Sequence, residues 1–315
     1  MTFESLLGND RLKQNLAESL EKNHISHFYL ISGPRGSGKK TLAKLLARAI
    51  LCQGARKPCG VCDACRKLTT GSHPDFITVE DPDHKNVAVK IVRQIRDDVF
   101  VRPNESDWKL YLFPQDLGVE GQNALLKILE EPPAYGIFLL LTDNPEKILP
   151  TVRSRCTELK LQALPADLLQ QQLARQFPES AAEDIRAAVQ RSGGFLGQAQ
   201  ELLQSGGAVP PQTEDLVRAL CSQDALLLAQ TLVPMEKWKR DALSDILQSW
   251  LELVQEALAD RSGRPALSPA ARQLAGSLTS ARLYALANSL KKALDYTGAN
   301  VSPAAVCGWL VWALR

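Results

Sequence analysis

The fold of this chain is decided by the stretch Gly33-Pro34-Arg35-Gly36-Ser37-Gly38-Lys39-Lys40-Thr41. An apolar run at residues 28–31 precedes it, and residues 41–51 follow with a helical pattern. Strand, glycine-rich loop and helix in this order form a phosphate-binding loop, because the loop amides and the helix N-terminus together surround phosphate oxygens. The stretch therefore predicts a P-loop NTPase architecture rather than a glycine-rich turn that only caps a helix.

One position of this loop departs from the Walker A pattern. That pattern has Ser or Thr directly after Gly-Lys, and the hydroxyl binds the magnesium ion. Lys40 occupies the position here, and Thr41 lies one residue later, roughly 100° further around the helix. We therefore expect hydrolysis to be impaired or lost and nucleotide binding to be weak or absent. The loop still keeps Gly33, Gly36, Gly38 and Lys39.

Length and composition indicate a globular protein of more than one domain. The chain has 315 residues, of which 45% are hydrophobic, and two or three domains are expected. It has no apolar run of about 18 residues and no signal-like N-terminus, so we expect a cytoplasmic protein without membrane contact. The formal net charge is +2, so any contact with nucleic acid must come from a local patch.

The cysteines predict a metal site. Seven are present, an odd number that argues against a disulfide framework. Four of them cluster with the spacing of a closed tetrahedral zinc site rather than of free thiols in a surface loop. These four are Cys52, Cys59, Cys62 and Cys65. Cys156, Cys221 and Cys307 are interpreted as small, partly buried side chains.

Strand and helix patterns alternate up to about residue 160, which predicts an α/β fold with a parallel sheet covered on both faces. The strand-like runs are 28–31, 76–79, 109–113, 137–141 and 158–161. The helical stretches between them are 10–22, 41–51, 89–99 and 122–130.

The second half of the chain has only helical patterns. They cover residues 167–177, 180–191 and 196–203, then 214–232, 235–258, 270–278 and 282–296. A last helix begins at Ser302-Pro303, a capping residue followed by proline. The Gly- and Pro-rich segment 204–211 is the clearest boundary. We expect a P-loop domain at 1–163 with the zinc module at 52–65, a helical lid at 164–206 and a helical oligomerisation domain at 207–315.

Several motifs occur in a fixed order, and together they resemble the bacterial clamp-loader branch of the AAA+ proteins. The P-loop with its preceding strand and the cysteine insertion after the P-loop helix are two of them. The branch's strongest local signature is matched by Asn123-Ala124-Leu125-Leu126-Lys127-Ile128-Leu129-Glu130-Glu131-Pro132-Pro133, and its arginine-finger motif by Ser154-Arg155-Cys156. The resemblance spans the chain but is specific only up to about residue 160.

Compared with hydrolysing members of the branch, this chain lacks three elements. Pro114 and Gln115 stand where those members have Asp-Glu at the end of the third strand, and Asp116 comes one residue too late. Gly197 stands where their lid has an arginine, and Lys40 replaces the magnesium ligand. Thr142 or Asn144 remains near the sensor position. Since phosphoryl transfer depends on positioning and charge stabilisation, these losses together predict negligible turnover.

Arg155, in contrast, is intact. By the resemblance it is an arginine finger that acts in trans, stabilising charge on a phosphoryl group bound to a neighbouring subunit. The resemblance thus implies a nonhydrolysing subunit of the DNA polymerase III holoenzyme that helps to load the sliding clamp onto primed DNA. It implies zinc as the cofactor, and as partners the motor (gamma/tau) and delta subunits, with the clamp and DNA contacted through the assembly.

Two other interpretations stay open from the sequence. The chain could be an active ATPase motor subunit with unusual motifs, which ATP hydrolysis by the purified chain would reveal. It could also be a zinc-dependent nucleic-acid-binding module, although phosphate binding needs concentrated lysine and arginine. Whether the chain is itself an enzyme is therefore left undecided at this point.

Overall fold

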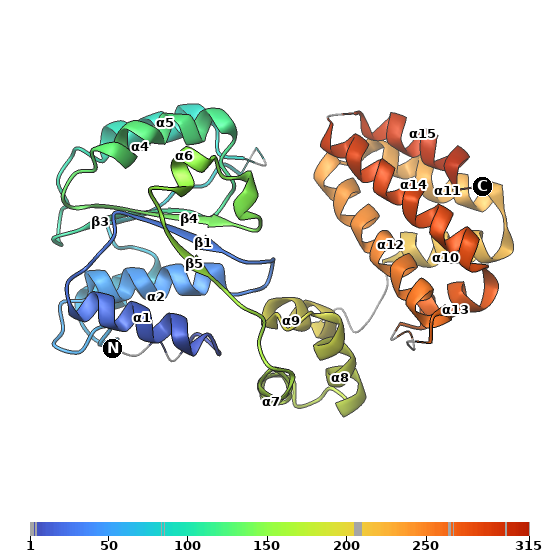
Figure 1. Cartoon of the computed structure of the whole chain (residues 1–315), viewed down its shortest axis with the longest axis horizontal. Coiled ribbons are helices and arrows are strands. Elements are labelled where there is room, and N and C mark those ends of the chain that lie inside the picture. Colours follow the sequence, from blue (N-terminus) through green and yellow to red (C-terminus); the bar gives the residue numbers. More distant parts are fainter. Residues whose placement is uncertain are drawn as a thin grey trace. The chain divides into compact units, whose positions relative to one another are not determined.

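The structure, a computed structural model, describes residues 3, 5–82, 84, 86–204, 210–263, 266, 268–299 and 301–314. The chain forms two compact units, Met1–Gln204 and Ser205–Arg315 (Figure 1). The first contains the sheet, and the second is helical in its described part. None of the described helices combines the length and the apolar character that crossing a membrane requires.

A five-stranded parallel sheet lies at the centre of the first unit, with strand order β2-β3-β4-β1-β5. The strands are β1 Phe28–Ser32, β2 Phe76–Thr78, β3 Lys109–Phe113, β4 Gly136–Thr142 and β5 Thr157–Lys160. β1, β3 and β4 are buried along their whole length, which explains their continuous apolar runs. The α/β fold class and all five predicted strands are confirmed, with ends that differ by one residue.

Helices cover both faces of this sheet (Figure 1). Tyr29 and Ile31 point to one face, where they share a core with α1 Asp10–Glu21 and α2 Lys39–Leu51. Phe28 and Leu30 point to the other face, where α4 Val89–Asp98 and α5 Val119–Glu130 pack. Alternate residues of one strand therefore stabilise two separate cores, which makes the position of the following P-loop rigid.

The remaining elements of the first unit are short. They are α3 Asp63–Thr70, the 3-10 helix η1 Pro145–Lys147, α6 Pro150–Arg153, α7 Ala166–Gln176, α8 Ala182–Arg191 and α9 Leu196–Gln204. The last three form a small bundle with its own core around Leu169, Leu173 and Ile185. The sequence patterns did not predict α3, which lies inside the cysteine-rich segment.

The second unit is built around a long helix, α12 Arg240–Arg261. Its Trp250 is fully buried and donates a hydrogen bond of 2.8 Å from Nε1 to Thr213 Oγ1. The other elements are α10 Pro211–Ser222, α11 Ala225–Leu232, η2 Val233–Lys237, α13 Pro269–Ser277, α14 Ser280–Gly298 and α15 Pro303–Ala313. As predicted, Ser302 caps α15, accepting a bond from Ala305 N.

Two predictions for this unit were wrong. Residues 214–232 are two helices, because Gln223 is left-handed (φ 54°) and the Asp224 side chain caps a new helix. The helix expected from residue 235 starts at Arg240, since Pro234 shapes the 3-10 turn before it. Trp312 is 73% exposed in the single chain. Residues 205–209 of the expected linker lie outside the described residues.

Candidate functional site

The P-loop residues lie between the end of β1 and the first turn of α2, where the sequence predicts them. Gly36 (φ 75°) and Gly38 (φ 94°) have left-handed backbones, which glycine adopts at little cost. The loop lines a cavity of about 740 Å³ whose other walls include Pro114, Asp143 and Gly197. Space for a ligand is therefore present, and the charges and donors around it decide what can bind.

The Lys39 ammonium is occupied by protein oxygens. It donates to Gly33 O at 2.6 Å, Pro34 O at 2.9 Å and Asp143 Oδ1 at 2.5 Å. An ammonium has three N–H donors, so none is left for a phosphate oxygen. Asp143 also places a negative charge where a nucleotide phosphate would have to approach Lys39.

The magnesium position is filled by a second lysine. Lys40 Nζ lies 3.8 Å from Glu80 Oε1, and both side chains are more than half exposed. A lysine ammonium donates hydrogen bonds and cannot ligate a cation. Thr41, the displaced hydroxyl, is exposed on the next position of α2.

The residues that follow β3 anchor a neighbouring loop. Gln115 accepts a bond from Asp81 N at 2.7 Å and donates to Asp81 O at 3.0 Å, so its amide holds the loop after β2. Asp116 accepts a bond of 3.0 Å from the buried Thr142 hydroxyl. The Asn144 side chain caps η1 through Glu146 N at 2.9 Å. The two sensor candidates, Thr142 and Asn144, thus make structural contacts and, among the described residues, do not adjoin a pair of carboxylates that could bind a metal ion.

The lid bundle touches the P-loop directly, backbone to backbone. Gly197 N donates to Gly36 O at 2.9 Å, and Gln198 Nε2 donates to Arg35 O at 3.0 Å. A Cβ atom on Gly197 would lie 2.6 Å from Gly36 Cα, which is too close for any side chain. Only glycine at position 197 permits this contact.

Arg155 lies in the short turn between α6 and β5 and is exposed. Its Nη1 donates to Thr151 O at 2.9 Å and its Nη2 to Glu130 Oε1 at 3.2 Å. The following residue, Cys156, is partly buried, and burial raises the pKa of its thiol to about 11. Arg155 is thus a charged side chain on a well-anchored turn, far along the chain from the P-loop.

The four cysteines predicted to bind metal are close together in space. Their sulfur atoms all lie within 4.8 Å of one another, and Cys52 Sγ is 3.9 Å from Cys62 Sγ. Zinc–sulfur bonds of roughly 2.3 Å in a tetrahedron place sulfurs roughly 3.8 Å apart. Backbone N–H groups of Gly54 and Cys59 donate to Cys52 Sγ at 3.3 and 3.2 Å, which favours a thiolate there.

The chemistry of this cluster fits a metal cation. A Cβ atom on Gly54 would lie 2.9 Å from Cys59 Sγ, so the segment closes tightly around the sulfurs. Burial raises the pKa of Cys52, and with the neighbouring thiols raises that of Cys65 to about 12. Backbone N–H donors lower the pKa of Cys59, and at Cys62 burial acts to raise the pKa, but hydrogen bonds outweigh it and lower the pKa to about 6. Four adjacent thiols cannot ionise together without a compensating cation, which zinc would supply.

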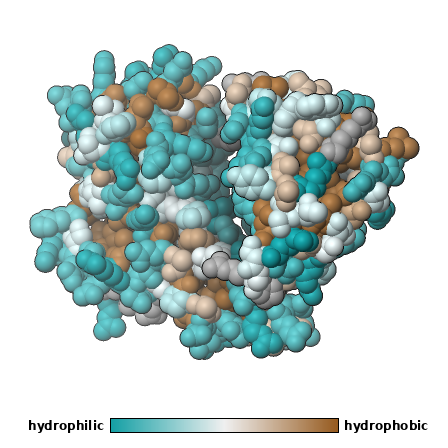
Figure 2. Space-filling view, turned by 45° about the vertical axis from the view of Figure 1, so that its right-hand side comes forward, coloured by the Kyte–Doolittle hydropathy of each residue, from teal (hydrophilic) through white to brown (hydrophobic). Residues whose placement is uncertain are grey.

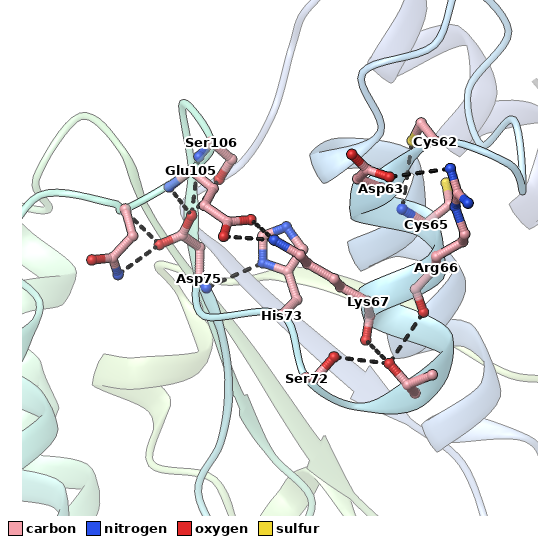
Figure 3. Close-up of polar contacts among 12 residues, drawn as sticks. Cys62, Asp63, Cys65, Arg66, Lys67, Ser72, His73, Asp75, Glu105 and Ser106 are labelled. Carbon is pink, nitrogen blue, oxygen red and sulfur yellow. Dashed lines mark hydrogen bonds and ion pairs between the residues drawn. The ribbon is translucent and has the colours of Figure 1, made fainter.

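Helix α3 connects the cysteine cluster to the edge of the sheet (Figure 3). Cys62 caps α3, and Lys67 on that helix pairs with Glu105 at 2.5 Å. The loop containing Glu105 is held by the buried Asp75 carboxylate, which accepts bonds from Asn104 N at 2.6 Å, Glu105 N at 2.8 Å and Ser106 N at 3.0 Å. Burial acts to raise the pKa of Asp75, but these donors outweigh it and hold the pKa below its ordinary value.

Sequence reasoning missed two residues of these sites. Asp143 lies between the two sensor candidates Thr142 and Asn144, and its pairing with Lys39 joins positions 104 residues apart. Glu130 was recognised only as part of the signature segment 123–133, and the structure shows that it contacts Arg155 across 25 residues. The one available signal was a carboxylate at a helix C-terminus, where the helix dipole disfavours it.

The parallel sheet with a P-loop after β1, followed by a small helical bundle against that loop, defines an AAA+ fold. Residues 8–165, half of the chain, match the protein family described as DNA polymerase III, delta subunit. The chain belongs to this family.

The curated relatives of the chain carry the names of DNA polymerase III subunits. It is 37% identical over 178 residues to DNA polymerase III subunit gamma/tau of Mycobacterium tuberculosis, covering 55% of this chain and 31% of that protein. It is 40% identical over 158 residues to subunit tau of Bacillus subtilis, covering 49% and 28%. The chain thus spans less than a third of the length of these relatives.

Among solved structures, a DNA polymerase III gamma subunit-related protein of Thermotoga maritima aligns with a TM-score of 0.45 and 18% sequence identity. The alignment covers 96% of this chain and 98% of that protein.

Proposed function

We propose that this chain is the delta prime subunit of the bacterial DNA polymerase III clamp loader. In this role it does not hydrolyse ATP. It joins a ring of related subunits, supplies Arg155 to the ATP site of a neighbouring motor subunit and so helps to load the sliding clamp onto primed DNA. The motor (gamma/tau) and delta subunits are its direct partners, and clamp and DNA are reached through the assembly in the cytoplasm.

The observation that carries the proposal is the occupied Lys39 ammonium. All three of its donors are used within the chain, one of them by the carboxylate of Asp143. The arrangement at Lys40, Gln115 and Gly197 favours the same conclusion, since each residue has a structural contact in place of a catalytic one. Arg155, in contrast, is exposed on a fixed turn and can approach a neighbouring subunit.

The domain assignment is part of the proposal. Residues 1–163 act as the P-loop domain, with zinc held by Cys52, Cys59, Cys62 and Cys65, and residues 164–206 act as the lid. Residues 207–315 form the oligomerisation domain. The exposed apolar side chains of the second unit, among them Leu226, Tyr284 and Trp312, support a surface that partners cover. Figure 2 shows apolar residues, in brown, at the surface of the molecule.

A second candidate is an active ATPase motor subunit of the same loader. One observation favours it: the two curated relatives that are 37% and 40% identical to this chain carry the names gamma/tau and tau. The matched part covers less than a third of those proteins, so their names describe much more chain than the match contains.

The two candidates are distinguished by reconstitution with a gamma/tau-type motor and a delta subunit from the same bacterium. We expect no ATP hydrolysis by this chain alone with DNA and clamp. Adding it to the motor should restore clamp loading, and Arg155→Ala should assemble normally but slow loading. A finger contributes on the order of 10³ in rate at one isolated site, and the bulk effect is smaller because other sites keep working. Arg155→Lys should rescue poorly, since one ammonium cannot reproduce the paired contacts of a guanidinium.

Robust turnover by the chain alone would assign it to the motor class. Wild-type clamp loading by an intact Arg155→Ala assembly would make Arg155 an ordinary surface residue, and the proposed role would be abandoned.

A further inference from the structure

The Arg155 side chain is tied to a helix that precedes it in the chain. Its Nη2 pairs with Glu130 Oε1 at 3.2 Å, and its Nη1 is fixed by Thr151 O at 2.9 Å. The nearby Arg153 pairs instead with Glu158 at 3.0 Å, three residues beyond Arg155. Of these two arginines, only Arg155 is held from α5.

Glu130 occupies a position that the helix itself disfavours. It is the last residue of α5, where the unsatisfied carbonyl groups carry partial negative charge and a cation would be preferred. Glu131 follows directly, so two carboxylates adjoin the same helix end. A residue that contradicts the local preference is often explained by function, and here the nearest partner of Glu130 is the Arg155 guanidinium.

The geometry leaves part of the guanidinium free. Arginine has five N–H donors, and Thr151 and Glu130 each take one. The Arg155 side chain is 39% exposed, so its remaining donors can face a partner. Two anchors on two different elements restrict the torsions of a long side chain that would otherwise lose much rotamer freedom on binding a phosphate.

We propose that Glu130 is a positioning residue for Arg155, holding the guanidinium so that its free donors meet the phosphate of a neighbouring subunit. This inference rests on the proposed function of Arg155. Glu130 does not touch the nucleotide. Its carboxylate restricts the finger before assembly and keeps it oriented during the reaction.

The test is a double-mutant cycle in the reconstituted assembly, with Glu130→Gln, Arg155→Ala and the double variant. Gln keeps the shape of the side chain but removes the charge. Glu131→Gln is the matched control, because Glu131 is adjacent and exposed and makes no ion pair among the described residues. At the ATP site that Arg155 serves, we expect Glu130→Gln to lower the rate about two- to fivefold, the range typical of an exposed ion pair, with KM for ATP unchanged. The rate of clamp loading reports this effect, because other sites of the ring contribute to bulk hydrolysis.

Two further results are expected if Glu130 acts through Arg155. Glu130→Gln should have no added effect in the Arg155→Ala background, and its effect should shrink at high salt, where exposed charges are screened. The inference is overturned if Glu130→Gln behaves like Glu131→Gln, or if it slows the Arg155→Ala assembly by the same factor as the wild type. If Arg155→Ala alone leaves the rate unchanged, the proposed function itself fails, so the two failures are distinguishable.

Discussion

Lys39 Nζ lies 2.5 Å from Asp143 Oδ1, so the lysine of the P-loop is neutralised by a carboxylate from the turn after β4. In a nucleotide-binding P-loop this lysine contacts the phosphates. The Lys39 side chain is only 13% exposed here, and the three partners of its ammonium leave no donor for a ligand. A cavity of about 740 Å³ lies beside it, so charge and available donors, rather than lack of space, limit what can bind.

Replacing Asp143 should therefore restore anion binding without restoring catalysis. Asp143→Asn removes the charge that competes with phosphate, and we expect ATP or tripolyphosphate to bind at least about tenfold more tightly, which corresponds to about 1.4 kcal/mol. Titration calorimetry measures this directly. Glu80→Gln, which frees Lys40 rather than Lys39, is the control and should change binding less. Turnover should stay absent, because Pro114 and Gln115 provide no acidic pair. Equal binding by Asp143→Asn and wild type would show that Asp143 does not limit the site.

The lid contact leads to a second prediction. Gly197→Ala places a Cβ 2.6 Å from Gly36 Cα, so the Gly197 N–H bond to Gly36 O should break and the lid should separate from the P-loop. Faster amide hydrogen exchange at residues 195–200 would report this opening. Gly298→Ala is a matched control, since its Cβ would meet nothing within 4 Å. If exchange in this segment is unchanged in Gly197→Ala, the lid is held by other contacts.

Much of the fold could be predicted because its signals are local. β3 begins and ends at the predicted residues, since residues 110–113 form the continuous apolar run of a strand buried on both faces and Pro114 follows directly. The break at Gln223 was missed because helix periodicity continues across it. Only the capping role of Asp224, which accepts bonds from Leu226 N and Leu227 N, shows that a new helix starts there.

The site could be predicted only in part, for a physical reason. The cysteine spacing specifies its own geometry, because the ligands lie within 14 residues of sequence. The partners of Lys39 and Arg155 cannot be obtained this way. Asp143 comes close to Lys39 only when β4 lies beside β1, and Glu130 comes close to Arg155 only when α5 packs near the turn before β5. Neither acidic residue can therefore be distinguished from other surface acids in the sequence, because only the folded arrangement of strands and helices places it beside its basic partner.

The cysteine cluster should hold one zinc ion per chain. Cys65→Ser replaces a fully buried thiol of the cluster, and we expect its zinc content to fall to near zero. Cys221→Ser removes a thiol outside the cluster and should keep one zinc. Elemental analysis of freshly purified, unchelated protein is the measurement. Substantially less than one zinc in the wild type, or full zinc in Cys65→Ser, would contradict the assignment.

Asp75 should contribute a pH-dependent part of the stability. Its carboxylate accepts backbone bonds from three successive residues beginning at Asn104, and Asp75→Asn keeps the size but loses the charge. We expect the free energy of unfolding at pH 7 to fall by about 2–3 kcal/mol, since hydrogen bonds to a charged group are among the stronger ones. Because the pKa of Asp75 is lowered by folding, this stability is present above the ordinary aspartate pKa of about 3.9 and is lost as the pH falls through the folded value.

The difference between wild type and Asp75→Asn in urea unfolding should therefore be constant from pH 7 to about pH 5 and shrink below pH 4. Comparing two proteins at each pH cancels acid effects that they share, including protonation of the cysteine cluster. Asp107→Asn lies in the same loop and is exposed, so it serves as the control and should change the unfolding free energy little. A difference that stays constant down to pH 3 would mean that the Asp75 side chain stabilises the loop through its shape and not through its charge.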